Sequence, residues 1–277
     1  MPTPSPKSII ITGGASGIGL SLTRHFAAQG HRVAILDLNA AAGQEAAAAA
    51  AADFPQAAVS FHLCNVASWD EQAAAFEKAF QALGDRLDVV VANAGVSEQG
   101  ATTLVRLDEE KAPSRPGVAT VEVNLLGAVY SVNLAVHYMN RKPKTEGGSR
   151  GSIICTASNA GLYPLPVAPL YAASKFGVVG LVRSTARVIE KANMQINALA
   201  PAVLDTNIAP DKDLFRHMVV TPMATLLRGV DQFLADPSVS GAVAEIHGDS
   251  VTIRPPHEYV DDDSKNNIET FWNLGYA

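Results

Sequence analysis

Residues 8–19, S-I-I-I-T-G-G-A-S-G-I-G, join a short apolar run to a turn that is rich in glycine. Glycines in such a turn permit positive φ angles and let a ligand approach the backbone closely. The free N–H groups at the start of the helix that follows, together with the helix dipole, suit an anion such as a pyrophosphate. The spacing is G-x-x-x-G-x-G rather than G-x-G-x-x-G, so the turn alone is a weak indication of nucleotide binding.

Outward from this turn, apolar runs alternate with helical patterns along most of the chain. The predicted strands are 8–12, 31–37, 59–63, 89–92, 151–156, 195–199 and 242–247, and the predicted helices are 18–29, 40–52, 69–83, 118–139, 170–191 and 221–235. Right-handed crossovers between parallel strands place helices on both faces of the sheet. We therefore expect one α/β domain over 7–253 with a seven-stranded, doubly wound parallel sheet of the Rossmann type, a lead-in at 1–6 and a polar tail at 254–277.

Composition limits the class of protein. The chain has 277 residues, of which 48% are hydrophobic and 17% charged, so it can bury a large core and is not a disordered chain. Its formal charge of −6 argues against nucleic acid as the main partner. Two cysteines form no disulfide framework, which favours a reducing, cytoplasmic location. Residues 151–174 carry no charge and are long enough to span a bilayer, but three prolines among them favour a soluble protein with no membrane span.

Asp37 ends the second predicted strand, eighteen residues beyond Gly19. A carboxylate at this point can accept hydrogen bonds from an adenosine ribose, and it repels a 2′-phosphate. The neighbouring Ala15, Leu38 and Asn39 offer no cation to hold such a phosphate. The pattern therefore favours NAD over NADP as the cofactor, with the alternative that Asp37 only caps the following helix.

Tyr171 and Lys175 lie at the start of a long helical pattern, in Y-A-A-S-K. Residues four apart share one face of a helix, so the two side chains are neighbours. A free tyrosine has a pKa of about 10, and an adjacent ammonium favours the phenolate, which suits a general base. Taken alone, a Tyr-x-x-x-Lys pair is more often a coincidence of the surface than a catalytic pair.

Together the motifs resemble those of the short-chain dehydrogenase/reductase family, from residue 7 to about 248. The matching pieces are T-G-G-A-S-G-I-G at 12–19, Asp37, A-N-A-G at 92–95, N-L-L-G from Asn124, Ser158, Y-A-A-S-K at 171–175 and P-A-V-L-D-T at 201–206. Their order and spacing match as well, including the thirteen residues from Ser158 to Tyr171. Within the family the chain looks most like the 15-hydroxyprostaglandin dehydrogenase type and its fungal relatives.

This resemblance implies a catalytic set of four residues. Tyr171 would be the acid/base that takes the hydroxyl proton while hydride leaves the same carbon for the nicotinamide. Lys175 would lower the pKa of Tyr171 and bind the nicotinamide ribose, and Ser158 would orient the substrate oxygen. Asn124 would hold a water molecule that links Lys175 to solvent. No metal site is expected.

The resemblance also implies which residues bind NAD. They are Gly13, Ser16, Gly17, Ile18, Gly19, Asp37, Asn65, Val66, Asn93, Ala94, Gly95, Tyr171, Lys175, Pro201, Val203 and Thr206. The chain departs from the family pattern at three positions. Asn65 stands where the family usually has Asp beside the adenine, and its amide can still bind the adenine amino group. Ala92 replaces the first Asn of N-N-A-G, and Ala202 replaces the glycine after Pro201, which bears on cofactor affinity or substrate shape.

The substrate pocket is expected between the loop after Ser158 and the region 203–221. Ser158, Asn159, Tyr171 and mostly apolar neighbours would line it, the latter being Leu162, Tyr163, Leu165, Val167, Val203, Leu204 and Ile208. An apolar secondary alcohol fits such a pocket better than a sugar or a charged acid. The alternative is that these apolar residues fill the core or a subunit interface.

We therefore predict an NAD-dependent dehydrogenase that acts on a lipid-like or secondary-metabolite alcohol as a homodimer or homotetramer. One alternative is a biosynthetic ketoreductase that uses NADPH, against which Asp37 counts. The other is a non-redox protein on the same scaffold, such as a cyclase, an isomerase or a cofactor-sensing module. The complete set of Ser158, Tyr171 and Lys175 counts against that class.

Overall fold

The computed structural model describes residues 5–98, 104, 112, 115–142, 148–206 and 212–275. Its strands form one eight-stranded sheet in the order β3-β2-β1-β4-β5-β6-β7-β8. They are β1 (Ser8–Thr12), β2 (Arg32–Asp37), β3 (Ala58–Leu63), β4 (Val89–Ala92), β5 (Gly151–Thr156), β6 (Met194–Pro201), β7 (Val243–His247) and β8 (Ser250–Arg254). The first seven strands pair in parallel, so the predicted doubly wound fold is confirmed.

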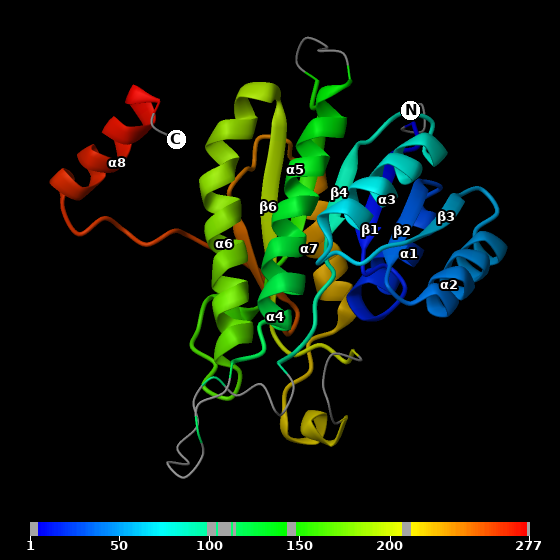
Figure 1. Cartoon of the computed structure of the whole chain (residues 1–277), viewed down its shortest axis with the longest axis horizontal. Coiled ribbons are helices and arrows are strands. Elements are labelled where there is room, and N and C mark those ends of the chain that lie inside the picture. Colours follow the sequence, from blue (N-terminus) through cyan, green and yellow to red (C-terminus); the bar gives the residue numbers. More distant parts are fainter. Residues whose placement is uncertain are drawn as a thin grey trace.

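Helices cover both faces of the sheet (Figure 1). They are α1 (Gly17–Ala28), α2 (Ala40–Asp53), α3 (Trp69–Ala82), α4 (Ala119–Val121), α5 (Gly127–Asn140), α6 (Pro169–Ile189), α7 (Met223–Ala235) and α8 (Asp262–Leu274). The predicted helix over 118–139 is interrupted by a π-helical turn, η2 (Glu122–Leu126). Such turns are rare and often occur at functional sites.

Side-chain alternation along the strands divides the core between the two faces. Ile10 of β1 and Val90 of β4 belong to the cluster that includes side chains of α3, α5 and α6. Ile9 and Val89, one residue earlier on the same strands, belong to the cluster that includes α1 and α7. Successive side chains of a strand point to opposite faces, so a strand buried on both sides must be apolar throughout. This is why the strands appeared in the sequence as continuous apolar runs.

The end of the chain contains more regular structure than its sequence pattern predicted. β8 pairs antiparallel with β7, and it adds an eighth strand at the edge of the sheet. Within the tail expected at 254–277, α8 begins after Asp261, whose carboxylate accepts a hydrogen bond from the Ser264 amide at 2.7 Å. Arg187 of α6 forms an ion pair of 2.8 Å with Glu269. Polar, exposed elements of this kind lack the apolar runs on which the prediction relied.

Among the described residues, one helical run, Ala119–Asn140, is long and apolar enough to cross a membrane by length and composition. The core helix of a soluble protein passes the same test, and Ala128, Val132 and Ala135 of this run pack into the core beside the sheet. Residues 151–174, which raised the same question in the sequence, form β5, a loop with a short 3-10 helix and the start of α6.

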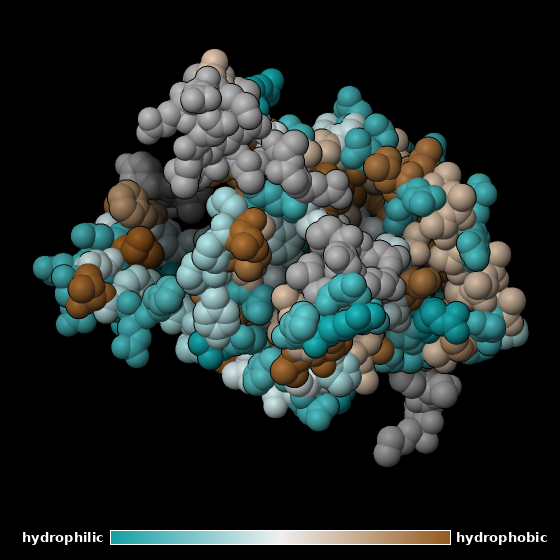
Figure 2. All heavy atoms as spheres, turned by 90° about the horizontal axis from the view of Figure 1, so that it is seen from below, coloured by the Kyte–Doolittle hydropathy of each residue, from teal (hydrophilic) through white to brown (hydrophobic). Residues whose placement is uncertain are grey.

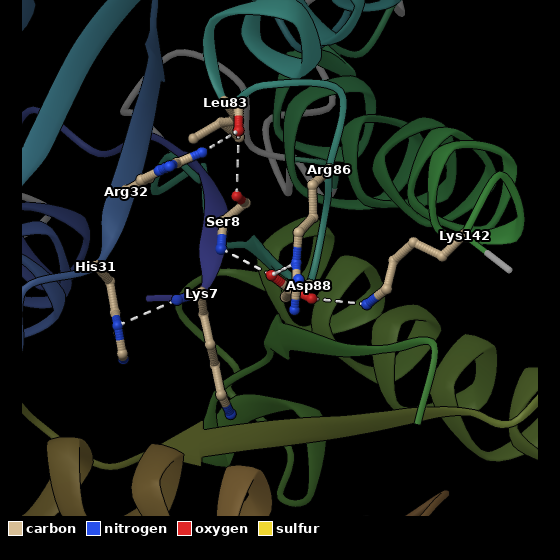
Figure 3. Close-up of polar contacts among 8 residues, drawn as sticks. All are labelled: Lys7, Ser8, His31, Arg32, Leu83, Arg86, Asp88 and Lys142. Carbon is tan, nitrogen blue, oxygen red and sulfur yellow. Dashed lines mark hydrogen bonds and ion pairs between the residues drawn. The ribbon is translucent and has the colours of Figure 1, made fainter. Parts of the chain in front are cut away.

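Asp88 joins several segments at the end of the sheet where the parallel strands begin (Figure 3). It accepts hydrogen bonds from the Ser8 amide at 2.9 Å, Arg86 Nε at 2.8 Å and Lys142 Nζ at 2.6 Å. Burial by itself would raise the pKa of Asp88, but these bonds outweigh it and hold the pKa below its ordinary value. A carboxylate with a lowered pKa in the folded state stabilises the fold above its unfolded pKa, and this contribution is lost as the pH falls through the folded value.

We expect Asp88→Asn to reduce the free energy of unfolding at neutral pH by about 2 kcal/mol, because it removes the charge from a buried acceptor that Ser8, Arg86 and Lys142 share. The difference from the wild type should shrink below a pH of about 4, where the wild-type carboxyl also becomes protonated. Urea unfolding at several pH values measures both effects. Asp53→Asn is the control, since the Asp53–Arg24 pair is half exposed and should contribute under about 1 kcal/mol. Equal losses in the two variants would contradict the role of Asp88.

Candidate active site

A cavity of about 610 Å³ lies at the end of the sheet where the parallel strands finish. Its lining includes Gly13 after β1, Asp37 at the end of β2, Asn93 after β4 and Ser158 after β5. β1 and β4 are neighbours in the sheet although β2 and β3 lie between them in the sequence. The strand order therefore reverses between β1 and β4. Open α/β sheets bind their ligands at such a switch point. Figure 2 views the molecule from this end, where hydrophobic residues lie among hydrophilic ones.

The glycine-rich turn approaches its neighbours too closely for larger residues. A Cβ atom on Gly13 would lie 2.8 Å from the Cα of Ala94, and Gly13 also has a positive φ of 64°. A Cβ atom on Gly19 would lie 2.0 Å from the carbonyl oxygen of Gly13. Ser16 precedes α1 without a side-chain capping bond, so the first amides of α1 remain available at the cavity. This arrangement fits a pyrophosphate, which needs backbone N–H groups at a helix N-terminus.

Asn93 holds the turn in place from the neighbouring loop. Its amide nitrogen donates to the carbonyl oxygens of Thr12 at 3.1 Å and Gly13 at 3.3 Å, while its carbonyl oxygen accepts from Thr156 Oγ1 at 3.1 Å. The backbone amide of Asn93 also donates to Thr12 Oγ1 at 3.0 Å. The loops after β1, β4 and β5 are therefore fixed to one another along the cavity floor.

Asp37 lies at the far end of the cavity, with Leu38, Asn65 and Val66 nearby in its lining. Its carboxylate accepts from the Ala15 amide at 3.1 Å and the Asn39 amide at 3.0 Å. The cap of α2 is Asn39, which accepts from the Ala42 amide, so Asp37 is not the helix cap. Among the described lining residues, Asp37 is the single carboxylate and Lys175 the single cation. This end of the cavity therefore offers a charge that suits ribose hydroxyls and disfavours a phosphate.

Ser158, Tyr171 and Lys175 meet at the opposite end. Burial raises the pKa of Tyr171, and a hydrogen bond with Ser158 partly offsets that rise. Lys175 is fully enclosed and donates to the Thr156 carbonyl oxygen at 2.8 Å. Burial lowers the pKa of Lys175 to about 8. Lys175 Nζ lies 5.6 Å from the centre of the Tyr171 ring and is directed at a backbone carbonyl, so the pKa of Tyr171 follows mainly from its burial. The expected lowering of the Tyr171 pKa by Lys175 stays a prediction.

Asn124 is buried in the π-helical turn beside the cavity rather than in its lining. Its carbonyl oxygen accepts from the Val96 amide at 2.8 Å, and its Nδ2 donates to the Val96 carbonyl oxygen at 3.0 Å and to Ser174 Oγ at 3.2 Å. Gly95 lies between Asn124 and Lys175, and a Cβ atom there would be 3.2 Å from Asn124 Oδ1. The amide of Asn124 thus connects the loop after β4 to α6.

Most predicted site residues meet in this one cavity. The lining includes Gly13, Ser16, Gly17, Ile18, Asp37, Asn65, Val66, Asn93, Ala94, Gly95, Ser158, Asn159, Leu165, Tyr171, Lys175, Pro201, Val203, Leu204 and Thr206. Gly19 and Asn124 lie behind it. Ile208 lies outside the described residues, as do residues 1–4 of the expected lead-in.

Tyr163 is placed differently from the prediction. Its hydroxyl donates to the Glu245 carboxylate of β7 at 3.0 Å, so it faces the edge of the sheet instead of the cavity. Leu162 and Val167 are also missing from the described lining. Val96, Ser97 and Met218 do line the cavity, although none of them was named individually in the prediction. Val96 and Ser97 follow A-N-A-G directly, so their place after a parallel strand could have indicated them. Met218 lies within the region 203–221 that was expected to border the pocket.

A family model described as short chain dehydrogenase matches residues 7–216. The chain belongs to the short-chain dehydrogenase family. Members of this family are oxidoreductases that use nicotinamide cofactors, and the cavity between the glycine-rich turn and Tyr171 has the groups to hold one. The predicted family is thereby confirmed.

Several relatives are short-chain dehydrogenases, and two of them are named as dehydrogenases of hydroxy compounds. The short-chain dehydrogenase/reductase prx4 of Penicillium roqueforti is 38% identical over 74% of this chain, but the match spans only 56% of prx4. A 5′-hydroxyaverantin dehydrogenase of Dothistroma septosporum is 32% identical over 96% of this chain and 89% of its own. The bovine 15-hydroxyprostaglandin dehydrogenase [NAD(+)] is 29% identical over 87% and 90%.

The fold of this chain is similar to that of a solved reductase structure. The NADPH-dependent 3-quinuclidinone reductase of Rhodotorula rubra superposes with a TM-score of 0.72 at 28% identity, covering 87% of this chain and 90% of the reductase. The names of the bovine and Rhodotorula enzymes specify different cofactors. The family therefore establishes a nicotinamide cofactor, and the choice between NAD and NADP depends on residues of this chain.

We expect Gly19→Ala to lower the affinity for NADH by more than about tenfold, since the new methyl group would force apart the turn and α1, where we expect the pyrophosphate to bind. Fluorescence titration measures the affinity, and thermal unfolding reports any general damage. Gly180→Ala is the matched control, because a Cβ atom on Gly180 of α6 meets nothing within 4 Å. Unchanged NADH binding by Gly19→Ala would contradict the assignment of this turn.

Proposed function

We propose that this enzyme is an NAD-dependent dehydrogenase of apolar secondary alcohols, with Tyr171 as the acid/base. The observation that carries the proposal is the distribution of polar groups in one cavity, with Asp37 at one end and the hydroxyls of Ser158 and Tyr171 at the other. When bound, NAD⁺ supplies a nicotinamide ring that accepts a hydride. The protein must hold the alcohol and remove its hydroxyl proton.

Tyr171 and Ser158 would perform these two tasks. Both hydroxyls line the same cavity, so a substrate oxygen near them can be bound by both. The raised pKa keeps Tyr171 protonated near neutral pH, which suits proton donation to a carbonyl. Alcohol oxidation needs the phenolate, so it should become faster as the pH rises. Lys175, with a pKa of about 8, can exchange a proton in the same pH range.

The apolar side chains at this end support an apolar substrate. Val96, Leu165, Val203, Leu204 and Met218 line the same cavity as the hydroxyls of Ser158 and Tyr171. Pockets lined by apolar residues with few polar groups bind ligands mainly by excluding water from apolar surface. A lipid-like or secondary-metabolite alcohol therefore suits the site better than a sugar or a charged acid.

We further propose that the enzyme acts as a cytoplasmic homodimer or homotetramer. Leu126, Phe176 and Val188 on η2 and α6 are large apolar side chains that remain exposed at 39%, 44% and 50% of their surface. Large apolar side chains exposed on two elements that contact each other favour burial against another subunit. Light scattering of the purified enzyme measures the assembly, and a monomer at micromolar concentration would contradict it.

The cofactor preference is tested by titrating the enzyme with NADH and, separately, with NADPH. We expect NADH to bind at least about tenfold more tightly, because Asp37 repels the 2′-phosphate of NADPH and no described lining residue near it is a cation. Asp37→Ala should reduce this preference by removing the repulsion. Tighter binding of NADPH by the wild type would refute the NAD assignment and favour reduction of ketones.

The acid/base role is tested by the pH profile of cyclohexanol oxidation. Ser158→Ala removes the hydrogen bond that lowers the pKa of Tyr171, so the rise of kcat should move to higher pH. Tyr171→Phe should lower kcat by about a thousandfold at every pH, since general acid–base catalysis contributes factors of this size. Ser97→Ala is the control, because Ser97 lines the cavity without contributing to the Tyr171 pKa. If Tyr171→Phe retained its activity, Tyr171 would not be the base.

A further inference from the structure

The helix that carries Tyr171 begins without a capping residue of its own. Ala168 occupies the N-cap position and has no side-chain acceptor, and Pro169 follows as the first helical residue. Proline has no N–H group, so it needs no partner there. The amides of Leu170 and Tyr171 have no intrahelical acceptor, because the first N–H groups of any helix lack one. Ala172 is the first residue whose amide binds back, to the Ala168 carbonyl oxygen at 3.0 Å.

One carboxylate from a distant part of the chain accepts hydrogen bonds from both of these amides. Glu98 Oε2 accepts from the Leu170 amide at 2.8 Å and from the Tyr171 amide at 3.2 Å. The other oxygen of Glu98 is buried, and it has no hydrogen-bond partner among the described residues. A carboxylate at a helix N-terminus is favoured both by the dipole and by charge-assisted bonds. Glu98 therefore replaces the missing cap from 72 residues away.

Glu98 ends a described segment, 93–98, that also touches the cofactor side of the cavity. Asn93, Ala94 and Gly95 in this segment line the cavity. Its Val96 is bound through backbone N–H and C=O to Asn124. Asn124 therefore fixes this loop at the cofactor side, and Glu98 connects the same loop to the first turn of α6.

A second route joins the same two elements. Asn124 Nδ2 donates to Ser174 Oγ at 3.2 Å, and Ser174 Oγ donates to the Tyr171 carbonyl oxygen at 2.7 Å. The amide of Tyr171 is thus bound by Glu98, while its carbonyl is reached through Ser174 and Asn124. Both backbone polar groups of Tyr171 are tied to the loop that follows β4.

We propose that Glu98 is a positioning residue for Tyr171, because it caps α6 in place of Ala168 and fixes its first turn to the loop that borders the cofactor. This inference rests on the proposed function, since it concerns the same acid/base. Glu98 does not line the cavity, and it acts through the backbone of the helix. Loss of the Glu98 carboxylate would release the first turn of α6 from the loop, and Tyr171 is the third residue of that turn.

The consequences for the reaction follow from geometry. Tyr171 must reach the substrate hydroxyl within hydrogen-bond distance, and a displacement of an ångström can slow a reaction by about a hundredfold. Cofactor binding depends mostly on the turn after β1 and on Asp37, which Glu98 does not touch. Loss of Glu98 should therefore affect kcat much more than the affinity for NADH.

The test compares Glu98→Ala and Glu98→Gln with the full-length wild type. Glu98→Ala removes both bonds, while the amide oxygen of Glu98→Gln can still accept from the two N–H groups. Asp261→Ala is the matched control, because it removes a carboxylate cap from α8 at a place remote from the cavity. Hydrogen exchange of peptides covering 168–175, the affinity for NADH and kcat for cyclohexanol oxidation are measured for each protein.

For Glu98→Ala we expect faster exchange in the first turn of α6 and a kcat lowered by about tenfold or more, with NADH affinity within about twofold of the wild type. Glu98→Gln should restore most of both properties, and Asp261→Ala should change exchange only near 262–265. Unchanged exchange in Glu98→Ala, or faster exchange with an unchanged kcat, would overturn the proposal. The exchange measurement needs no turnover, so a failure of the proposed oxidation is distinguishable from a failure of the Glu98 bond.

Discussion

The close contact between the turn at Gly13 and the loop at Ala94 is the constraint on which the site depends. β1 and β4 lie side by side while their connections leave in different directions, so a cavity opens above them. Only a residue without a side chain fits at Gly13, and Asn93 bonds to the carbonyl oxygens of Thr12 and Gly13 from the opposing loop. The remaining site residues follow the neighbouring strands and thus reach the same cavity.

Much of this arrangement was predictable from the sequence because it is determined locally. The apolar runs of β1 and β5 are buried on both faces, which requires continuous hydrophobicity, and parallel strands bring their final residues to one edge. Asp37, Asn93 and Ser158 each follow or end such a strand, so the strand pattern and the family motifs together assign them to one site. The Tyr171–Lys175 spacing likewise indicated one helix face.

Other features depend on contacts between distant segments, and the sequence did not reveal them. Tyr163 lies in an apolar loop, but its hydroxyl binds a carboxylate of β7 that is far away in sequence. In the sequence Glu98 is one polar residue among others in a loop, and only the structure shows that it lies beside the uncapped start of α6. The spacing of Tyr171 and Lys175 likewise shows which charge is near the phenol but not how deeply the phenol is buried, and burial is the largest influence on its pKa here.

The bond between Tyr163 and Glu245 connects the wall of the cavity with the edge of the sheet. Tyr163 stands in the same loop as Ser158 and Leu165, and Glu245 in turn faces Arg254 of β8 at 3.5 Å. A loop that borders the cavity is thus bound to β7, next to the edge strand β8, and neither strand lines the cavity. A substitution in the hairpin of β7 and β8 can therefore change the shape of the cavity without altering any residue that lines it.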